Sequence, residues 1–139
     1  MLKTPTRTLK DSGIFSTFAV RDSDLAKRFY GDSLGLDVRD GQMLGLFEIH
    51  HGDQVVVVYP KPDHKPAEFT VLNFVVDDVE KAVDELTTAG IVFERYDTDQ
   101  MHTDAKGIVR GQGPDIAWFK DPFGNILSII GRDGSTSPA

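Results

Sequence analysis

The sequence predicts an α+β fold of two tandem βαβββ modules, whose strands form a curved, mostly antiparallel, cup-shaped sheet with the helices outside. Short runs rich in β-branched and aromatic residues alternate with segments of helical periodicity. The chain also repeats itself with an offset of 55 or 56 residues, since FAVRD at 18–22 corresponds to FVVDD at 74–78, and SLGLDV at 33–38 to TAGIVF at 88–93. We therefore expect a single domain over 1–139, which is long enough to bury a core. Its expected parts are module one at about 12–60, a linker at about 61–68, module two at about 69–131 and a flexible tail at 132–139.

Module one is expected to begin with a strand at Ile14–Val20, which is rich in aromatic and β-branched residues. Asp22 or Ser23 is suited to cap a helix over about 24–33, and Gly35 stands where a helix C-terminal glycine belongs. Three further strands complete the module, at Leu36–Arg39, Met43–Ile49 and Val55–Tyr59, the last two joined by a turn at His51-Gly52-Asp53.

Module two repeats this pattern. A strand is expected at Val71–Val76, and Asp77 or Asp78 can cap a helix that runs through Leu86 and closes at Gly90. The three remaining strands are expected at Ile91–Tyr96, Asp115–Lys120 and Asn125–Ile130.

An insert at Asp97–Pro114 distinguishes the second module from the first. Loops of this length are usually functional or poorly ordered. Two interpretations stay open at this point: a lid or wall that closes over the cup, and a plain surface excursion.

The stretch DPFGN at 121–125 predicts a type I turn, with Pro122 presetting its own φ and Gly124 accepting a positive φ. The strand that follows is apolar on both faces except for Ser128. Because a strand with two apolar faces is covered on both sides, an inward hydroxyl there needs a partner or a ligand.

Three segments carry a resemblance to a known family: FAVRDSDLAKRFYGDSLGL (18–36), FVVDDVEKAVDELTTAGIVF (74–93) and AWFKDPFGNILSI (117–129). Paired βαβββ modules with a terminal DPxGN turn resemble the vicinal oxygen chelate superfamily, which includes glyoxalase I, bleomycin-resistance proteins and extradiol dioxygenases. The resemblance implies a cup-shaped sheet with helices outside. Reaction type varies across the superfamily, so the fold does not supply the function.

The resemblance also implies where a metal would bind. Metal-dependent members take ligands from four inward strand positions, usually His, Gln or Glu, and the ion polarises two neighbouring substrate oxygens. Here those positions fall at Phe15, at Val71, at Ser128 and within Val55–Tyr59, none of which supplies His or an acid. A one-residue slip of register turns every side chain to the other face and restores no ligand. We therefore expect no metal and no cofactor.

One alternative keeps a divalent metal ion. Glu48 and His50 share a strand face, and His102 lies in the insert, so the three form a conceivable non-standard ligand set. It would make the protein a metal-dependent lyase or dioxygenase of the same superfamily. The bland interpretation places these side chains in water.

Without a metal, strand alternation lines the cup with apolar residues, a few hydroxyls and one amide, as is usual for an apolar small-molecule pocket. The expected ligand-binding residues are Phe15, Thr17, Asn73, Arg110, Trp118 and Ser128. Val71 is expected to face the cup as well, and Arg110 to be solvated or to swing over it toward an anionic ligand. Tyr30 and Tyr59 are expected to pack with their hydroxyls at the surface.

Composition narrows the class of protein. The net charge is −7 and the basic residues are scattered, which argues against nucleic-acid binding. The chain has no cysteine, no segment resembling a signal peptide and no apolar run of membrane-spanning length, so a cytoplasmic location away from membranes is expected. The sequence thus favours a homodimeric protein of the glyoxalase/bleomycin-resistance type that binds a small apolar or aromatic ligand, and leaves any catalysed reaction open.

Overall fold

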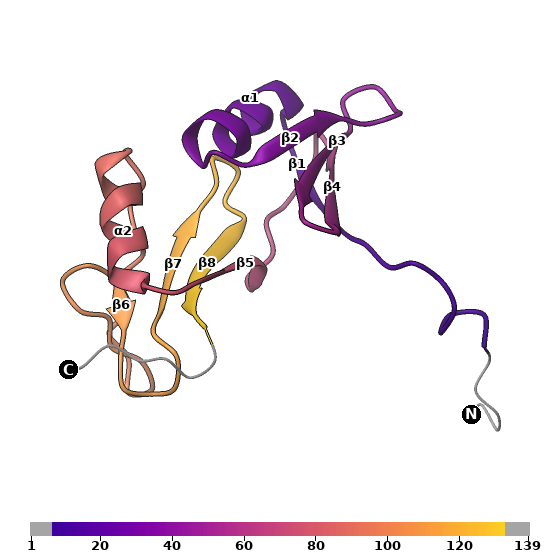
Figure 1. The fold of residues 1–139 in the computed structure, drawn as a ribbon. Coiled ribbons are helices and arrows are strands. Elements are labelled where there is room, and N and C mark those ends of the chain that lie inside the picture. The colour runs from indigo at the N-terminus through magenta and orange to yellow at the C-terminus, as the bar shows by residue number, and fades with distance from the viewer. Residues whose placement is uncertain (1–6, 133–139) are drawn as a thin grey trace.

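The computed structural model describes residues 7–132, which form two four-stranded sheets, one from each half of the chain (Figure 1). In the first sheet the strand order is β1-β4-β3-β2, and in the second it is β5-β8-β7-β6. The first and last strands of each module pair in parallel, and the other pairs are antiparallel. The strands are β1 (Ser16–Val20), β2 (Asp37–Asp40), β3 (Phe47–His51), β4 (Gln54–Pro60), β5 (Thr70–Val76), β6 (Ile108–Val109), β7 (Ile116–Lys120) and β8 (Ile126–Gly131). The predicted α+β fold of two modules is confirmed.

Each module carries one helical segment, and an aspartate caps the N-terminus of each. The α1 helix (Ser23–Lys27) continues as a π-helix, η1 (Arg28–Ser33), and α2 covers Val79–Thr88. The Asp22 side chain accepts a hydrogen bond from the Leu25 N–H, and Asp78 accepts one from the Lys81 N–H. These are N-caps that satisfy otherwise unpaired donors of the first turn, so of the two candidates at each helix start the aspartate immediately before the helix is the cap.

The helices cover one face of each sheet and build a core that runs through both modules. The core cluster includes Ala26 and Tyr30 from the helical segment of module one, and Val79 and Val83 from α2. It also includes Phe18, Val20, Phe47 and Val58 from the first sheet and Ala117, Phe119, Leu127 and Ile129 from the second. Since side chains alternate along a strand, the residues between these ones point to the opposite face, which we call the open face of each sheet.

The edge of the second sheet differs from the prediction. Ile91–Tyr96 is not a strand: Phe93 pairs with Phe119 in an isolated bridge, and the edge position beside β7 is taken by β6, inside the insert. Phe93 is buried under the helix and keeps its core position without a ladder. In module one, β3 begins at Phe47 and not at Met43, because the residues before it close a loop through a Gly41 N–H to Leu46 C=O hydrogen bond.

The DPFGN turn joins the two modules. The Asp121 carboxylate accepts four hydrogen bonds, from the Phe123 and Asn125 N–H groups, from the Asn125 side-chain amide and from the Tyr30 hydroxyl at 2.7 Å. The Asn125 amide also donates to the Ala19 C=O, in module one, at 2.9 Å. The turn itself matches the prediction, with Gly124 at φ 89° and its N–H donating to the Asp121 C=O.

Tyr30 contradicts the prediction made for it. Its side chain is fully buried, and its hydroxyl lies in the module junction and not at the surface. Burial, and next the charge and hydrogen bond of Asp121, raise the pKa of the Tyr30 phenol well above its ordinary value. The phenol therefore stays protonated and acts as a fixed donor between the modules.

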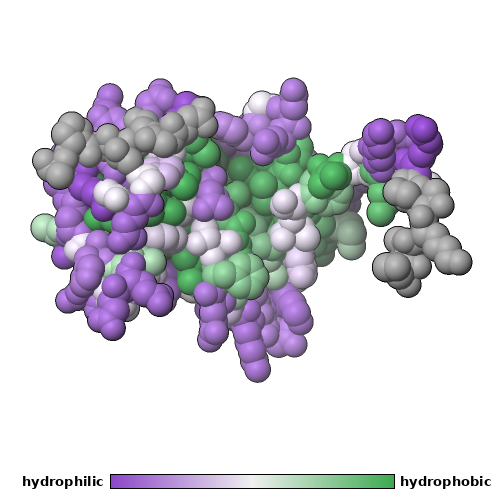
Figure 2. Space-filling view, turned by 90° about the horizontal axis from the view of Figure 1, so that it is seen from below, coloured by the Kyte–Doolittle hydropathy of each residue, from purple (hydrophilic) through white to green (hydrophobic). Residues whose placement is uncertain are grey.

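Viewed from below the orientation of Figure 1, apolar side chains gather in the middle of the molecule and hydrophilic ones toward the sides (Figure 2). Within residues 7–132, no helix combines the length and the apolar character needed to cross a membrane. The predicted flexible tail, apart from Arg132, lies outside the described residues.

Candidate functional site

The open face of the second sheet brings together three side chains that the sequence singled out. Asn73 on β5 is opposite Ser128 on β8, and Ser128 is opposite Trp118 on β7, so the three lie side by side across the sheet. The helix-facing residues Ala117, Phe119, Leu127 and Ile129 alternate with them, which places all three on the face opposite α2.

Trp118 lies across the central strand of this face. Its indole N–H donates to the Thr70 hydroxyl at 3.2 Å, and Thr70 is on β5 whereas Trp118 is on β7. Because β8 lies between these two strands, the ring has to pass over it. The Tyr96 ring packs edge-on against the indole, with centroids 5.6 Å apart and planes at 79°.

Ser128 lies on the strand that the indole crosses. It is 0% exposed, and its hydroxyl donates to the Asn73 side-chain oxygen at 2.5 Å. The requirement that this inward hydroxyl has a partner is therefore met by the amide, with Asn73 itself exposed to solvent.

A bulge near the start of β5 changes which residue lines this face. Thr70 pairs with Ile126, but Leu72 already pairs with Leu127, so Val71 is an extra residue in the ladder. Val71 packs against the buried core, and Thr70 takes the place on the open face. The expectation that Val71 lines the cup is wrong, because periodicity in a sequence carries no mark of a bulge. For the same reason Thr70 could not be singled out from the sequence. Tyr96 ends an expected strand that does not form, so strand alternation could not place it beside Trp118.

The open face of the first sheet changes from apolar to charged across its width. Thr17 on β1 donates to the Val57 C=O at 2.6 Å, and Phe15, just before the strand, is 65% exposed. On β3 the half-buried His50 and Glu48 contact each other through His50 Nε2 and Glu48 Oε1 at 2.7 Å. They thus share a face as predicted.

The alternative metal set is not assembled within the chain. His102 contacts the Asp97 carboxylate at 2.6 Å in the insert, and its side chain is 65% exposed. Among residues 7–132, no group of three His, Asp or Glu side chains is placed to hold a metal ion. Glu48 and His50 therefore form a pair without a third ligand from the described part of this chain.

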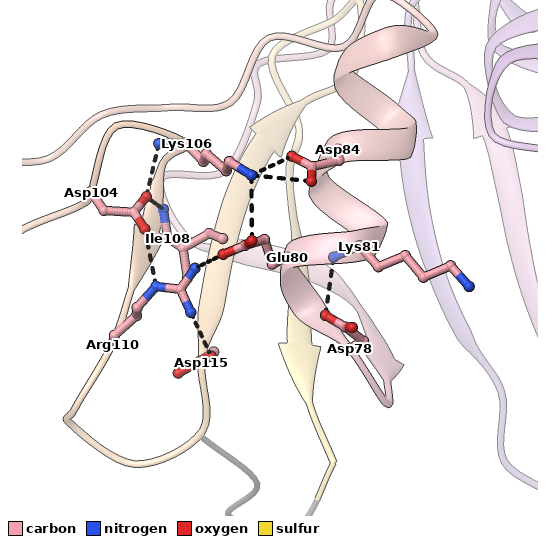
Figure 3. Close-up of polar contacts among 9 residues, drawn as sticks. All are labelled: Asp78, Glu80, Lys81, Asp84, Asp104, Lys106, Ile108, Arg110 and Asp115. Carbon is pink, nitrogen blue, oxygen red and sulfur yellow. Dashed lines mark hydrogen bonds and ion pairs between the residues drawn. The ribbon is translucent and has the colours of Figure 1, made fainter. Parts of the chain in front are cut away.

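Arg110 lies elsewhere than predicted, on the side of the sheet that carries α2 (Figure 3). Its guanidinium contacts Glu80 of α2 at 2.5 Å, Asp104 at 3.0 Å and the buried Asp115 at 3.3 Å. Arg110 is therefore neither solvated nor swung over the open face. Its pKa is raised, first by the hydrogen bond to Asp104, so it stays a cation.

Two cations fasten the second half of the insert to α2. Besides Arg110, Lys106 contacts Asp84 at 2.9 Å and Glu80 at 3.5 Å (Figure 3). Asp104 stabilises the turn between them by accepting from the Lys106 and Ile108 N–H groups. This part of the insert is a bound segment that supplies β6, and its charged groups hold the loop to α2.

Comparison with known proteins gives a consistent family assignment. The profile of the Glyoxalase/Bleomycin resistance protein/Dioxygenase superfamily matches residues 14–129. No curated protein sequence matches the chain.

Solved structures share the fold at low sequence identity. A bleomycin-binding protein complexed with bleomycin has 20% identity and a TM-score of 0.63, covering 88% of this chain and 99% of that one. TnmS3, an antibiotic-binding protein from Streptomyces sp. CB03234, has 19% identity and a TM-score of 0.62, covering 87% and 97%. A lactoylglutathione lyase from Agrobacterium tumefaciens has 22% identity and a TM-score of 0.58, covering 88% and 94%.

Proposed function

Because the chain belongs to the Glyoxalase/Bleomycin resistance protein/Dioxygenase superfamily, we propose that it binds a small apolar or aromatic molecule on the open face of its second sheet. The observation that carries this proposal is the arrangement of Trp118, with its indole tethered by Thr70 across β8 and braced by Tyr96. Two aromatic rings beside a hydroxyl and an amide have the composition of a small-molecule site, apolar surface with a few placed polar groups.

We propose that binding needs no metal ion. A metal site of the superfamily's kind does not fit the residues present. Ser128 is bonded to Asn73, Val71 is turned to the core, and Phe15 has no donor atom. The β4 strand (Gln54–Pro60) contains no acid and no histidine.

The names of two structural neighbours support the ligand class. One is described as a bleomycin-binding protein and another as an antibiotic-binding protein. We extend that class to this chain as a proposal: a planar or partly aromatic molecule that stacks on an exposed part of the Trp118–Tyr96 pair. Stacking of aromatic rings contributes about 0.5–1.5 kcal/mol beyond the apolar area that is buried.

We also propose that the protein works as a homodimer. Large apolar side chains remain exposed on the single chain at Phe15 (65%), Phe69 (69%) and Val75 (52%). A second copy that covers them would remove apolar surface from water and enclose the ligand face.

Titration of the purified protein tests the function. Trp118 is the sole tryptophan, so its emission reports on this face alone. A panel of planar aromatic compounds, bleomycin included, is titrated while emission is recorded, and calorimetry confirms each hit. We expect at least one saturable shift, weakened by Tyr96→Ala and unchanged by Tyr59→Phe on the first sheet. If no compound produces one, and native mass spectrometry of the protein as isolated shows no bound small molecule, the proposal fails.

The metal content of the same preparation tests the rival function, that of a metal-dependent lyase or dioxygenase. The observation that favours the rival is the Glu48–His50 contact. Elemental analysis of protein purified without chelators or affinity-tag metal separates the two. About one equivalent of zinc, nickel, iron or manganese per chain, removable by chelator and lost on His50→Ala, would support the enzyme.

A further inference from the structure

We infer that the open face of the second sheet selects ligands that carry a hydrogen-bond acceptor oxygen, such as a ketone, quinone or carboxylate, beside their aromatic ring. This inference rests on the proposed function and adds the polarity of the ligand to it. Two protein groups carry it, Asn73 and Thr70, both on β5 and both facing the ligand side.

Asn73 has one lone pair of its side-chain oxygen occupied and both N–H donors free. Its side-chain oxygen receives the Ser128 hydroxyl at 2.5 Å, which directs the amide NH₂ group away from β8. The Asn73 residue is exposed, and the described part of the chain supplies no acceptor to that NH₂ group. A ligand on the open face that extends over β5 as far as Asn73 therefore meets two N–H donors.

Thr70 likewise accepts a hydrogen bond within the protein, from the Trp118 indole, and keeps its own donor. Its oxygen accepts the indole N–H at 3.2 Å, which uses one of its two lone pairs and leaves the hydroxyl proton available to a ligand. The indole N–H is itself used up in this contact. One lone pair of each oxygen is used inside the protein. The three protons that remain, two on the Asn73 amide and one on the Thr70 hydroxyl, outnumber the two lone pairs that remain, so the face offers mainly donors.

The donors on this face should discriminate between ligands that carry an acceptor oxygen and ligands that lack one. A site whose polar groups are donors binds an acceptor oxygen and leaves those donors unpaired when the ligand lacks one. The difference amounts to roughly tenfold in affinity for one neutral hydrogen bond. An aromatic hydrocarbon of the same shape still stacks on the rings, but more weakly.

Two probes of one shape test the inference: 1-indanone, which carries a ketone oxygen, and indane, which does not. Binding to the full chain labelled with ¹⁵N is followed by the single indole N–H resonance, which reports Trp118. We expect 1-indanone to bind about tenfold more tightly than indane. Asn73→Asp keeps the oxygen that Ser128 needs and replaces the NH₂ group, so it should remove most of that preference, measured as the ratio of the two affinities.

Thr70→Val is the second variant, because it removes the other donor without a charge. It should also reduce the preference, and the free indole N–H should move its own resonance in the absence of ligand. Equal affinity for the two probes in the parent protein overturns the acceptor inference and leaves the proposed function standing. Failure of both probes to shift the Trp118 resonance up to their solubility limits overturns both. A preference for 1-indanone that survives both substitutions assigns the acceptor to other residues and refutes the inference.

Discussion

Replacing Ser128 by glutamate places a carboxylate on a strand where the structure leaves no room for water. The residue is 0% exposed and is bonded to Asn73 under the path of the Trp118 indole. None of the contacts that the structure shows at Ser128 involves a cation: Lys120 at the end of β7 is paired with Glu94, and Arg110 lies on the α2 side of the sheet. The new anion would be buried without a partner, which costs about 3 kcal/mol when ionised.

That free energy sets the expected pKa. Since one pKa unit corresponds to about 1.4 kcal/mol, a penalty of about 3 kcal/mol raises the folded-state pKa of the introduced carboxyl from about 4.3 to about 6.5. Between these two values the folded protein binds more protons than the unfolded chain, so the free energy of unfolding falls as pH rises. The penalty is nearly absent below about pH 4 and complete above about pH 7.

Volume has to be separated from charge. Glutamate is larger than serine, and overpacking adds about 1–3 kcal/mol that does not depend on pH. Ser128→Gln has nearly the same volume without the charge and is the matched control. Ser128→Ala, which only removes the hydroxyl, should cost about 1 kcal/mol at most and should weaken a ligand that reports through Trp118.

The assay is urea unfolding of the four proteins at pH 5 and pH 8. We expect the Glu variant to lie about 1 kcal/mol below the Gln variant at pH 5 and about 3 kcal/mol below it at pH 8. Equal stability of the Glu and Gln variants at pH 8 would show that the side chain at 128 reaches water. The inward placement of Ser128, and with it the proposed ligand face, would then be wrong.

Four further predictions concern the frame around this face and the assembly of the protein. Tyr30→Phe removes the hydroxyl that donates to Asp121, so urea unfolding should show a loss of about 1.5–3 kcal/mol in the free energy of unfolding. Tyr59→Phe, at a half-exposed residue, is the control and should show no measurable loss. Equal effects of the two substitutions would contradict a stabilising role for the Tyr30–Asp121 hydrogen bond. Arg110→Gln removes the guanidinium that contacts the buried Asp115. It should cost about 1–3 kcal/mol and speed amide exchange around β6, whereas Lys106→Gln, whose side chain is 43% exposed, should cost less than about 1 kcal/mol. Burial raises the pKa of Asp104, but hydrogen bonds from the Ile108 N–H and from Arg110 outweigh burial, so the pKa is lowered overall. The stability that this carboxylate adds is therefore present above about pH 4 and is lost as pH falls through the lowered pKa. Amide-exchange protection of β6 that did not change down to pH 3 would argue against that contribution. Light scattering on a size-exclusion column should give the mass of a dimer at micromolar concentrations, and a monomer mass throughout would count against the homodimer.

Local chemistry explains why much of the fold was predictable. The two caps at Asp22 and Asp78, the positive φ of Gly124 and the alternation of β7 and β8 each depend on a few neighbouring residues. The repeat added the long-range information, because two similar segments imply two similar modules. These features needed no knowledge of distant contacts.

The errors lie where distant residues decide. Ile91–Tyr96 has strand composition, but the edge of the sheet went to Ile108–Val109, since Arg110 and Lys106 hold that segment to α2. The bulge at Val71 exchanged its place with Thr70, and neither residue's type signals that change. Arg110 was misplaced because its partner Glu80 is thirty residues away in the chain and on a helix.

The DPFGN turn shows how one short segment serves both the fold and the site. Asp121 would be a natural candidate for an acid or base, but its two oxygens already accept four donors, and it is only 4% exposed. A carboxylate enclosed in this way has no access to a ligand, and its role is to fix the residues that donate to it. What it positions is the start of β8, locked at Asn125 to the Ala19 C=O of the first module. Ser128 lies three residues after Asn125 on the same strand. The register that places its hydroxyl against Asn73 and opposite Trp118 therefore depends on the contacts that fix Asn125 and Asp121 to the first module. Loosening those contacts with Tyr30→Phe should therefore broaden the Trp118 indole resonance as well as lower stability.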